Sequence, residues 1–156
     1  MFVGDEIRLE VGFAVARERL TRLSERGALF EPAADAYGPG LTRVGLAGLS
    51  KLVRVQAHEL SCPDGSAGLA LRWEATGPGG GLFPALDADL RLAPDGDGSV
   101  LTLAGAYRPP LGPMGDALDR TLLHRVAAAT VRSFLARVAA QLTGHPVANG
   151  AGSPNA

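Results

Sequence analysis

The sequence predicts an α+β domain in which a curved antiparallel β-sheet wraps around a long C-terminal α-helix. Several short consecutive segments alternate apolar and polar residues, which is typical of antiparallel strands with one covered and one wet face. The last third of the chain instead repeats apolar residues at helical spacing. Because only this helix is long enough to cover the sheet, we expect the sheet to curl around it. Small facing side chains would then leave a cavity.

The C-terminal helix is predicted over Gly112–Gly144. Pro113 suits its first helical position, and Gly144 is a natural left-handed stop. Arg120 and His124 lie at the N-terminal end of its apolar side. That side carries Leu123, Ala127, Val131, Phe134, Leu135, Val138 and Leu142. Another side carries the polar residues Thr121, Arg125, Arg132 and Thr143.

The N-terminal segment predicts a strand followed by helices. Val3–Val11 alternates as a half-buried strand, and helical spacing from Phe13 ends at Gly27. A short second helix is predicted within Leu29–Tyr37. At the other end of the chain, residues 144–156 have no periodicity and are expected to be a disordered tail.

Four or five further strands are expected between these helices and the C-terminal helix. Turn residues separate them, as in Cys62–Gly65, Gly77–Gly81 and Pro94–Gly98. The strands are predicted in Thr42–Leu49, Val53–Leu60, Leu69–Ala75, Leu86–Leu92 and Leu101–Tyr107. Residues 1–143 are therefore expected to form one domain.

Length and composition narrow the classes of protein. A chain of 156 residues fits one domain with a sizeable core. Its 15 basic and 16 acidic residues give no basic field for nucleic acid. A single cysteine, Cys62, excludes an internal disulfide and is compatible with a reducing compartment. No signal peptide or run of about 20 apolar residues is present, so we expect a cytoplasmic protein without a membrane span.

Three runs carry a resemblance to a known family: LRWEATG from Leu71, ALDADLRL from Ala85 and AYRPPLG from Ala106. With the order of elements, they resemble bacterial members of the START-like superfamily, also called SRPBCC or helix-grip, over Met1 to about Thr143. The resemblance implies a hydrophobic cavity between the sheet and the C-terminal helix. Members bind lipids or aromatic molecules, or act as polyketide cyclases or aromatases. No catalytic motif is shared across so diverse a group, so no active residue is carried over.

Six residues are candidates for lining the cavity. Trp73 and Tyr107 are large aromatics on the expected inner face, where they could stack on a flat ligand or simply fill the core. Ala127 and Val131 face them from the helix. Arg120 and His124 could orient a polar group at the cavity mouth or move protons. The alternative, which we favour for these two, is a solvated helix edge.

Other polar groups predict structure rather than chemistry. Asp87 and Asp89, with Glu74 on the preceding strand, lie on the wet face, where pairing with Arg72 or Arg91 is expected. The histidines and Cys62 lack the spacing of a zinc site, and no cofactor motif is found.

Three functions stay open from the sequence. The first is carriage of a small hydrophobic ligand, aromatic or lipid-like, in an internal cavity. The second is a cyclase, aromatase or dehydratase that uses His124, Arg120 and Tyr107 as acid, base and anchor. The third is a partner-binding domain or homodimer with a filled core.

Overall fold

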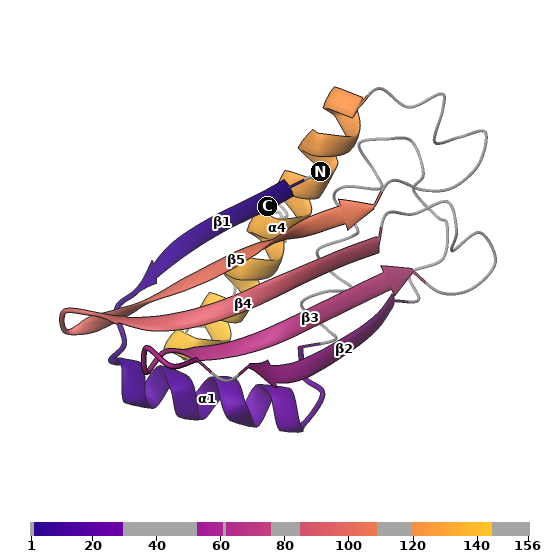
Figure 1. Cartoon of the computed structure of the whole chain (residues 1–156). Coiled ribbons are helices and arrows are strands. Elements are labelled where there is room, and N and C mark those ends of the chain that lie inside the picture. Colours follow the sequence, from indigo (N-terminus) through magenta and orange to yellow (C-terminus); the bar gives the residue numbers. More distant parts are fainter. Residues whose placement is uncertain (1, 30–52, 61, 76–84, 109–119, 145–156) are drawn as a thin grey trace, which may run out of the picture.

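The computed structural model describes residues 2–29, 53–60, 62–75, 85–108 and 120–144 (Figure 1). The elements follow the order β1 (Phe2–Leu9), α1 (Phe13–Glu25), β2 (Val53–Leu60), β3 (Ala67–Ala75), β4 (Ala85–Asp95), β5 (Gly98–Arg108) and α4 (Arg120–Thr143). The predicted strands at these positions and the first predicted helix are confirmed. Several predictions lie outside the described residues: the strand Thr42–Leu49, nearly all of the helix in Leu29–Tyr37, the loop Gly77–Gly81, the start of the long helix before Arg120, and the tail after Gly144.

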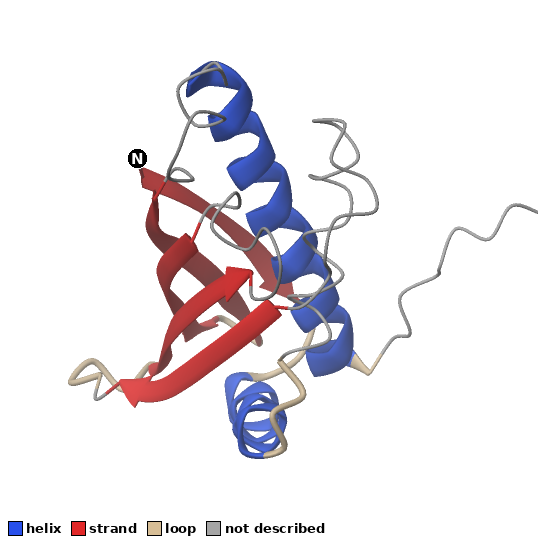
Figure 2. Cartoon of the chain, turned by 90° about the vertical axis from the view of Figure 1, so that its right-hand side faces the viewer, coloured by secondary structure: helices blue, strands red, loops and turns tan. Residues whose placement is uncertain are grey.

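The five described strands form one antiparallel sheet in the order β1-β5-β4-β3-β2. Helix α4 runs alongside one face of the curved sheet, with α1 beneath it (Figure 2). The backbone of α4 lies closest to β1 and also approaches β5, whereas α1 lies near β4, β5 and α4. The predicted α+β fold, with a curved antiparallel sheet around a C-terminal helix, is confirmed.

The core lies between the sheet and the two helices. Alternate strand residues point into it, including Leu71, Trp73, Leu86, Leu90, Leu92, Leu101, Leu103 and Tyr107. The predicted apolar side of α4 is buried at Ala127, Val131, Phe134, Leu135, Val138 and Leu142. Thr130 is also buried, and its hydroxyl satisfies its hydrogen-bonding need by donating to the carbonyl of Val126 at 2.9 Å.

Both helices end where the sequence predicts. Gly27 after α1 and Gly144 after α4 have φ of +65° and +76°, the left-handed conformation that favours glycine. Arg19 of α1 donates from its guanidinium to the carbonyl of Leu142 in the last turn of α4. A cation at the negative end of a helix is stabilising, so this contact fixes α1 against the end of α4.

A tight hairpin joins β4 and β5, as Pro94–Gly98 predicts. Gly96 has φ of +58°, and a Cβ at Gly98 would lie 2.5 Å from the carbonyl oxygen of Leu9. The buried hydroxyl of Ser99 donates to the carbonyl of Val11 at 2.9 Å. The hairpin is thereby attached to the segment between β1 and α1.

Candidate functional site

A row of three side chains crosses the inner face of the sheet. The register pairs Trp73 of β3 with Leu86 of β4, and Leu86 with Tyr107 of β5. Trp73 is 1% exposed and Tyr107 is 2% exposed, as their strand parity predicts. The structure therefore brings the two aromatic candidates to the same end of the sheet, with one strand between them.

Trp73 links β3 to the C-terminal helix. Its ring centroid lies 5.0 Å from that of Phe134, with the ring planes tilted by 59°. Tilted aromatic pairs at this distance are favourable by about 0.5 to 1.5 kcal/mol beyond the area they bury. Phe134 was placed on the apolar side of the helix by the sequence, but its contact with Trp73 was not predicted.

The buried residues of α4 that precede Phe134 have smaller side chains. Val131 lies one turn before Phe134, and Ala127 lies one turn further, and both are buried. The next row on the sheet is also small at its centre, where Ala88 pairs with Gly105. Both layers of the interior therefore contain a small buried side chain, Ala88 on the sheet and Ala127 on the helix.

Gly105 marks a close approach between β4 and β5. A Cβ built there would lie 2.5 Å from both the Cα and the Cβ of Ala88, and closer still to the carbonyl oxygen of Asp87. No larger residue fits without movement of the backbone. This glycine permits the close approach of the two strands.

Tyr107 has a perturbed ionisation. Burial raises the pKa of its phenol above the ordinary value near 10, because the charged phenolate loses its hydration. At neutral pH the group is a neutral phenol, able to donate one hydrogen bond and to accept others.

The polar pair predicted at the start of the helix has a different setting. His124 is exposed, which matches the favoured interpretation of a solvated helix edge. Arg120 begins the described part of α4, and its side chain lies outside the described residues. A role for either residue, or for Trp73, Tyr107, Ala127 and Val131, in ligand binding stays a prediction.

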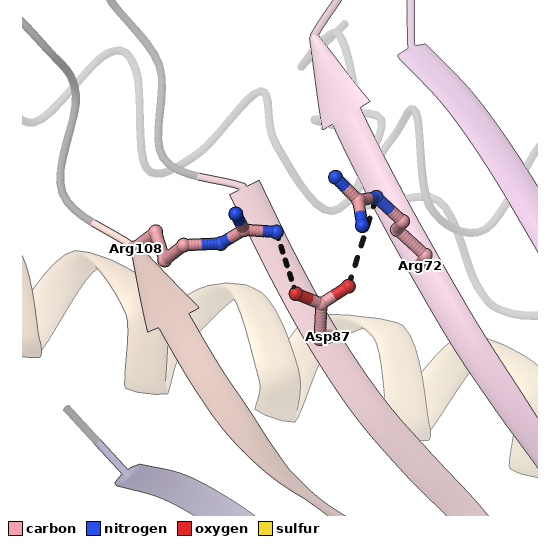
Figure 3. Close-up of polar contacts among 3 residues, drawn as sticks. All are labelled: Arg72, Asp87 and Arg108. Carbon is pink, nitrogen blue, oxygen red and sulfur yellow. Dashed lines mark hydrogen bonds and ion pairs between the residues drawn. The ribbon is translucent and has the colours of Figure 1, made fainter.

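Asp87 on the outer face pairs with an arginine from each neighbouring strand. Asp87 accepts a hydrogen bond from Arg108 at 2.8 Å and pairs with Arg72 at 3.7 Å (Figure 3). The pairing with Arg72 was predicted, whereas Arg108 was missed. The missed signal was the hairpin register, which places Arg108 opposite Ala85 and so diagonal to Asp87. Such exposed pairs contribute about 0 to 1 kcal/mol each.

Three hollows on the surface are bordered by described residues. One of about 320 Å³ lies between α1 and the β2–β3 hairpin, and one of about 380 Å³ lies on the outer face of the sheet. A third, of about 410 Å³, lies between β1 and α4. Trp73 and Tyr107 line none of these three. In the part of the chain that the structure describes, no three His, Cys, Asp or Glu side chains cluster as metal ligands would.

No protein-family model matches this chain, and no curated protein or solved structure does either. The arrangement of its elements, a five-stranded antiparallel sheet with a C-terminal helix, is consistent with a helix-grip-like α+β fold. None of the described helices is long and apolar enough to cross a membrane.

Proposed function

We propose that the chain is a START-like domain that carries a small hydrophobic ligand, aromatic or lipid-like, between the sheet and α4. The observation that carries the proposal is the buried row of Trp73, Leu86 and Tyr107 on the inner face of the sheet, together with the ring contact between Trp73 and Phe134 of α4. Ligand sites of this kind are mostly apolar, with a few polar groups that fix orientation.

The chemistry of the row suits an aromatic ligand. The indole of Trp73 already makes an aromatic pair with Phe134, and a flat ligand would extend or replace that pair. The neutral phenol of Tyr107 would supply a polar contact at the other end of the row. Ala127 and Val131 would contact the ligand from the helix and limit its thickness.

Carriage is favoured over a cyclase, aromatase or dehydratase reaction. Such a reaction needs an acid or base within hydrogen-bond reach of the bound substrate. His124, the predicted proton donor, is exposed, whereas Tyr107 lies buried in the interior. The protein would therefore hold its ligand without changing it.

A fluorescence titration tests the proposal. Trp73 is the only tryptophan, so energy transfer from it to bound anilinonaphthalene sulfonate reports on the interior. We expect saturable binding of one probe per chain, and competition by a fatty acid or a naphthol. Val131→Phe should weaken binding about tenfold or more by occupying the space beside the aromatic pair.

The matched control is Val15→Phe, because Val15 is 44% exposed on α1. This variant should bind the probe as the unaltered protein does. Ala127→Leu provides a second, smaller obstruction if Val131→Phe fails to fold. Unaltered protein that takes up no probe, or obstructed variants that bind it normally, would remove the carrier proposal.

A further inference from the structure

Strand β1 forms one edge of the sheet because it pairs only with β5 among the described strands. Backbone groups that point away from β5 therefore have no strand partner in the described part of the chain. Such an edge is a template for another strand unless the sequence blocks it. Phe2–Leu9 contains neither proline nor lysine, which often block edges. Its inward acid, Asp5, is already paired with Arg132 at 3.2 Å, and it also accepts a hydrogen bond from the backbone N–H of Glu6 at 3.0 Å.

A hollow of about 410 Å³ lies along this edge. Its first wall consists of the consecutive residues Ile7, Arg8, Leu9 and Glu10. Because consecutive strand residues point to opposite faces, the surface that Ile7, Arg8 and Leu9 share is backbone. Its second wall belongs to α4 and consists of Ala136, Ala139, Ala140 and Thr143. These short, uncharged side chains leave room beside the edge.

The charges of β1 are complementary to those of a second, antiparallel β1. A two-fold axis at Ile7 places Glu6 opposite Arg8 of the second copy, and does so twice. It also brings together the two half-buried Ile7 side chains on the inner face. Opposite charges directly across a strand pair are stabilising.

Other symmetric registers within β1 are less favourable, and an axis at Leu9 would pair Arg8 with Glu10, which lies beyond the end of β1. An axis at Asp5 or Glu6 opposes two identical acids, and an axis at Arg8 opposes two arginines. An axis at Gly4 creates no pair of opposite charges. A shift by one residue between copies would turn one sheet over, so that its apolar face no longer continues that of the other.

We propose that the chain forms a two-fold symmetric dimer in which the two β1 edges pair antiparallel about Ile7. The two sheets then continue into one another, and the hollow beside α4 receives the edge of the second copy. The contact uses the same surface on both copies, so it closes at two and leaves no β1 edge free.

Charge reversal tests this register. Sedimentation between roughly 1 µM and 100 µM should show a concentration-dependent dimer, since this range covers micromolar affinities. Glu6→Arg alone and Arg8→Glu alone should each weaken the dimer about tenfold or more, because each creates two like-charge pairs. Mixed together, the two variants should form a heterodimer in native mass spectrometry, because the two arginines on β1 of one variant then face the two glutamates on β1 of the other.

Two controls keep the test decisive. Arg91→Glu reverses an exposed charge on β4 and should leave the dimer unchanged. Ala136→Trp should fill the hollow and give a folded monomer, whereas Ala14→Trp, at an exposed position of α1, should not. Ala136→Trp also decides the question if the charge variants do not fold.

The proposal fails if the unaltered protein is monomeric throughout the concentration range. It fails equally if a dimer forms but survives Ala136→Trp, or if the mixed charge variants show no preference for the heterodimer. Probe binding near Trp73 is measured separately, so loss of the dimer and loss of ligand binding are distinguishable.

Discussion

Replacement of Gly105 by alanine should destabilise the protein strongly, because the new methyl group has no space. It would lie 2.5 Å from the Cα and Cβ of Ala88. Since carbon atoms pack best at about 3.5 to 4.0 Å, the backbone of β4 or β5 must move by roughly 1 Å. Overpacking usually costs about 1 to 3 kcal/mol, and we expect about 3 kcal/mol here because backbone atoms make the contact.

Urea unfolding followed by Trp73 fluorescence measures this effect. With a slope of about 1 to 3 kcal/mol per molar urea, the midpoint should fall by roughly 1 to 3 M. The matched control is Gly12→Ala, where the nearest atom, the carbonyl oxygen of Asp97, lies 3.7 Å from the new Cβ. This control should change the free energy of unfolding by about 0.5 kcal/mol or less. Equal, small changes in the two variants would refute the inferred close approach of β4 and β5.

Three further predictions concern single side chains. Arg19→Ala should lower the free energy of unfolding by about 1 to 2 kcal/mol because it removes the cation at the end of α4. The control is Arg22→Ala, which breaks an exposed pair within α1. In the same denaturation assay it should lower the free energy of unfolding by about 0.5 kcal/mol or less. Burial raises the folded-state pKa of Tyr107, so the contribution of its neutral phenol to the free energy of unfolding is complete below about pH 10 and is lost as the pH rises further. The free energy of unfolding measured against pH should show this alkaline loss, and Tyr107→Phe should reduce it. Hydrogen bonds from the Ser66 hydroxyl and backbone N–H lower the pKa of Asp64. Ser66→Ala should therefore raise the pKa of Asp64 in a carbon NMR titration. An unchanged pKa would contradict this cause.

The faces of the strands could be predicted because alternation is a local property. Leu71 and Trp73 point inward while Asp87 and Asp89 point outward, as their parity requires. The pairing of Asp87 with Arg108 depends on the register of two strands. That register is set by the hairpin turn. It is harder to predict from the sequence than the face on which each strand residue lies.

The position of the helix was less accessible to sequence reasoning. Asp5 has the parity of an inward residue, which contradicts a purely apolar inner face. Its partner, Arg132, is 127 residues away in the sequence, and no local pattern connects the two. Similarly, Thr130 was not expected in the core, because the buried part of α4 is wider than a single apolar stripe.

The contacts that hold α4 also indicate which of them an aromatic ligand could replace. Arg132 pairs with β1 near one edge of the sheet, and Arg19 holds the last turn of the helix. Toward β3, the helix is linked by the Trp73–Phe134 ring pair, worth about 0.5 to 1.5 kcal/mol beyond burial. Under the proposed function, a flat ligand that replaces Phe134 against Trp73 regains most of that energy while both charged contacts persist. Phe134→Leu, which removes the competing ring and leaves both charged contacts in place, should therefore strengthen rather than abolish binding of an aromatic ligand.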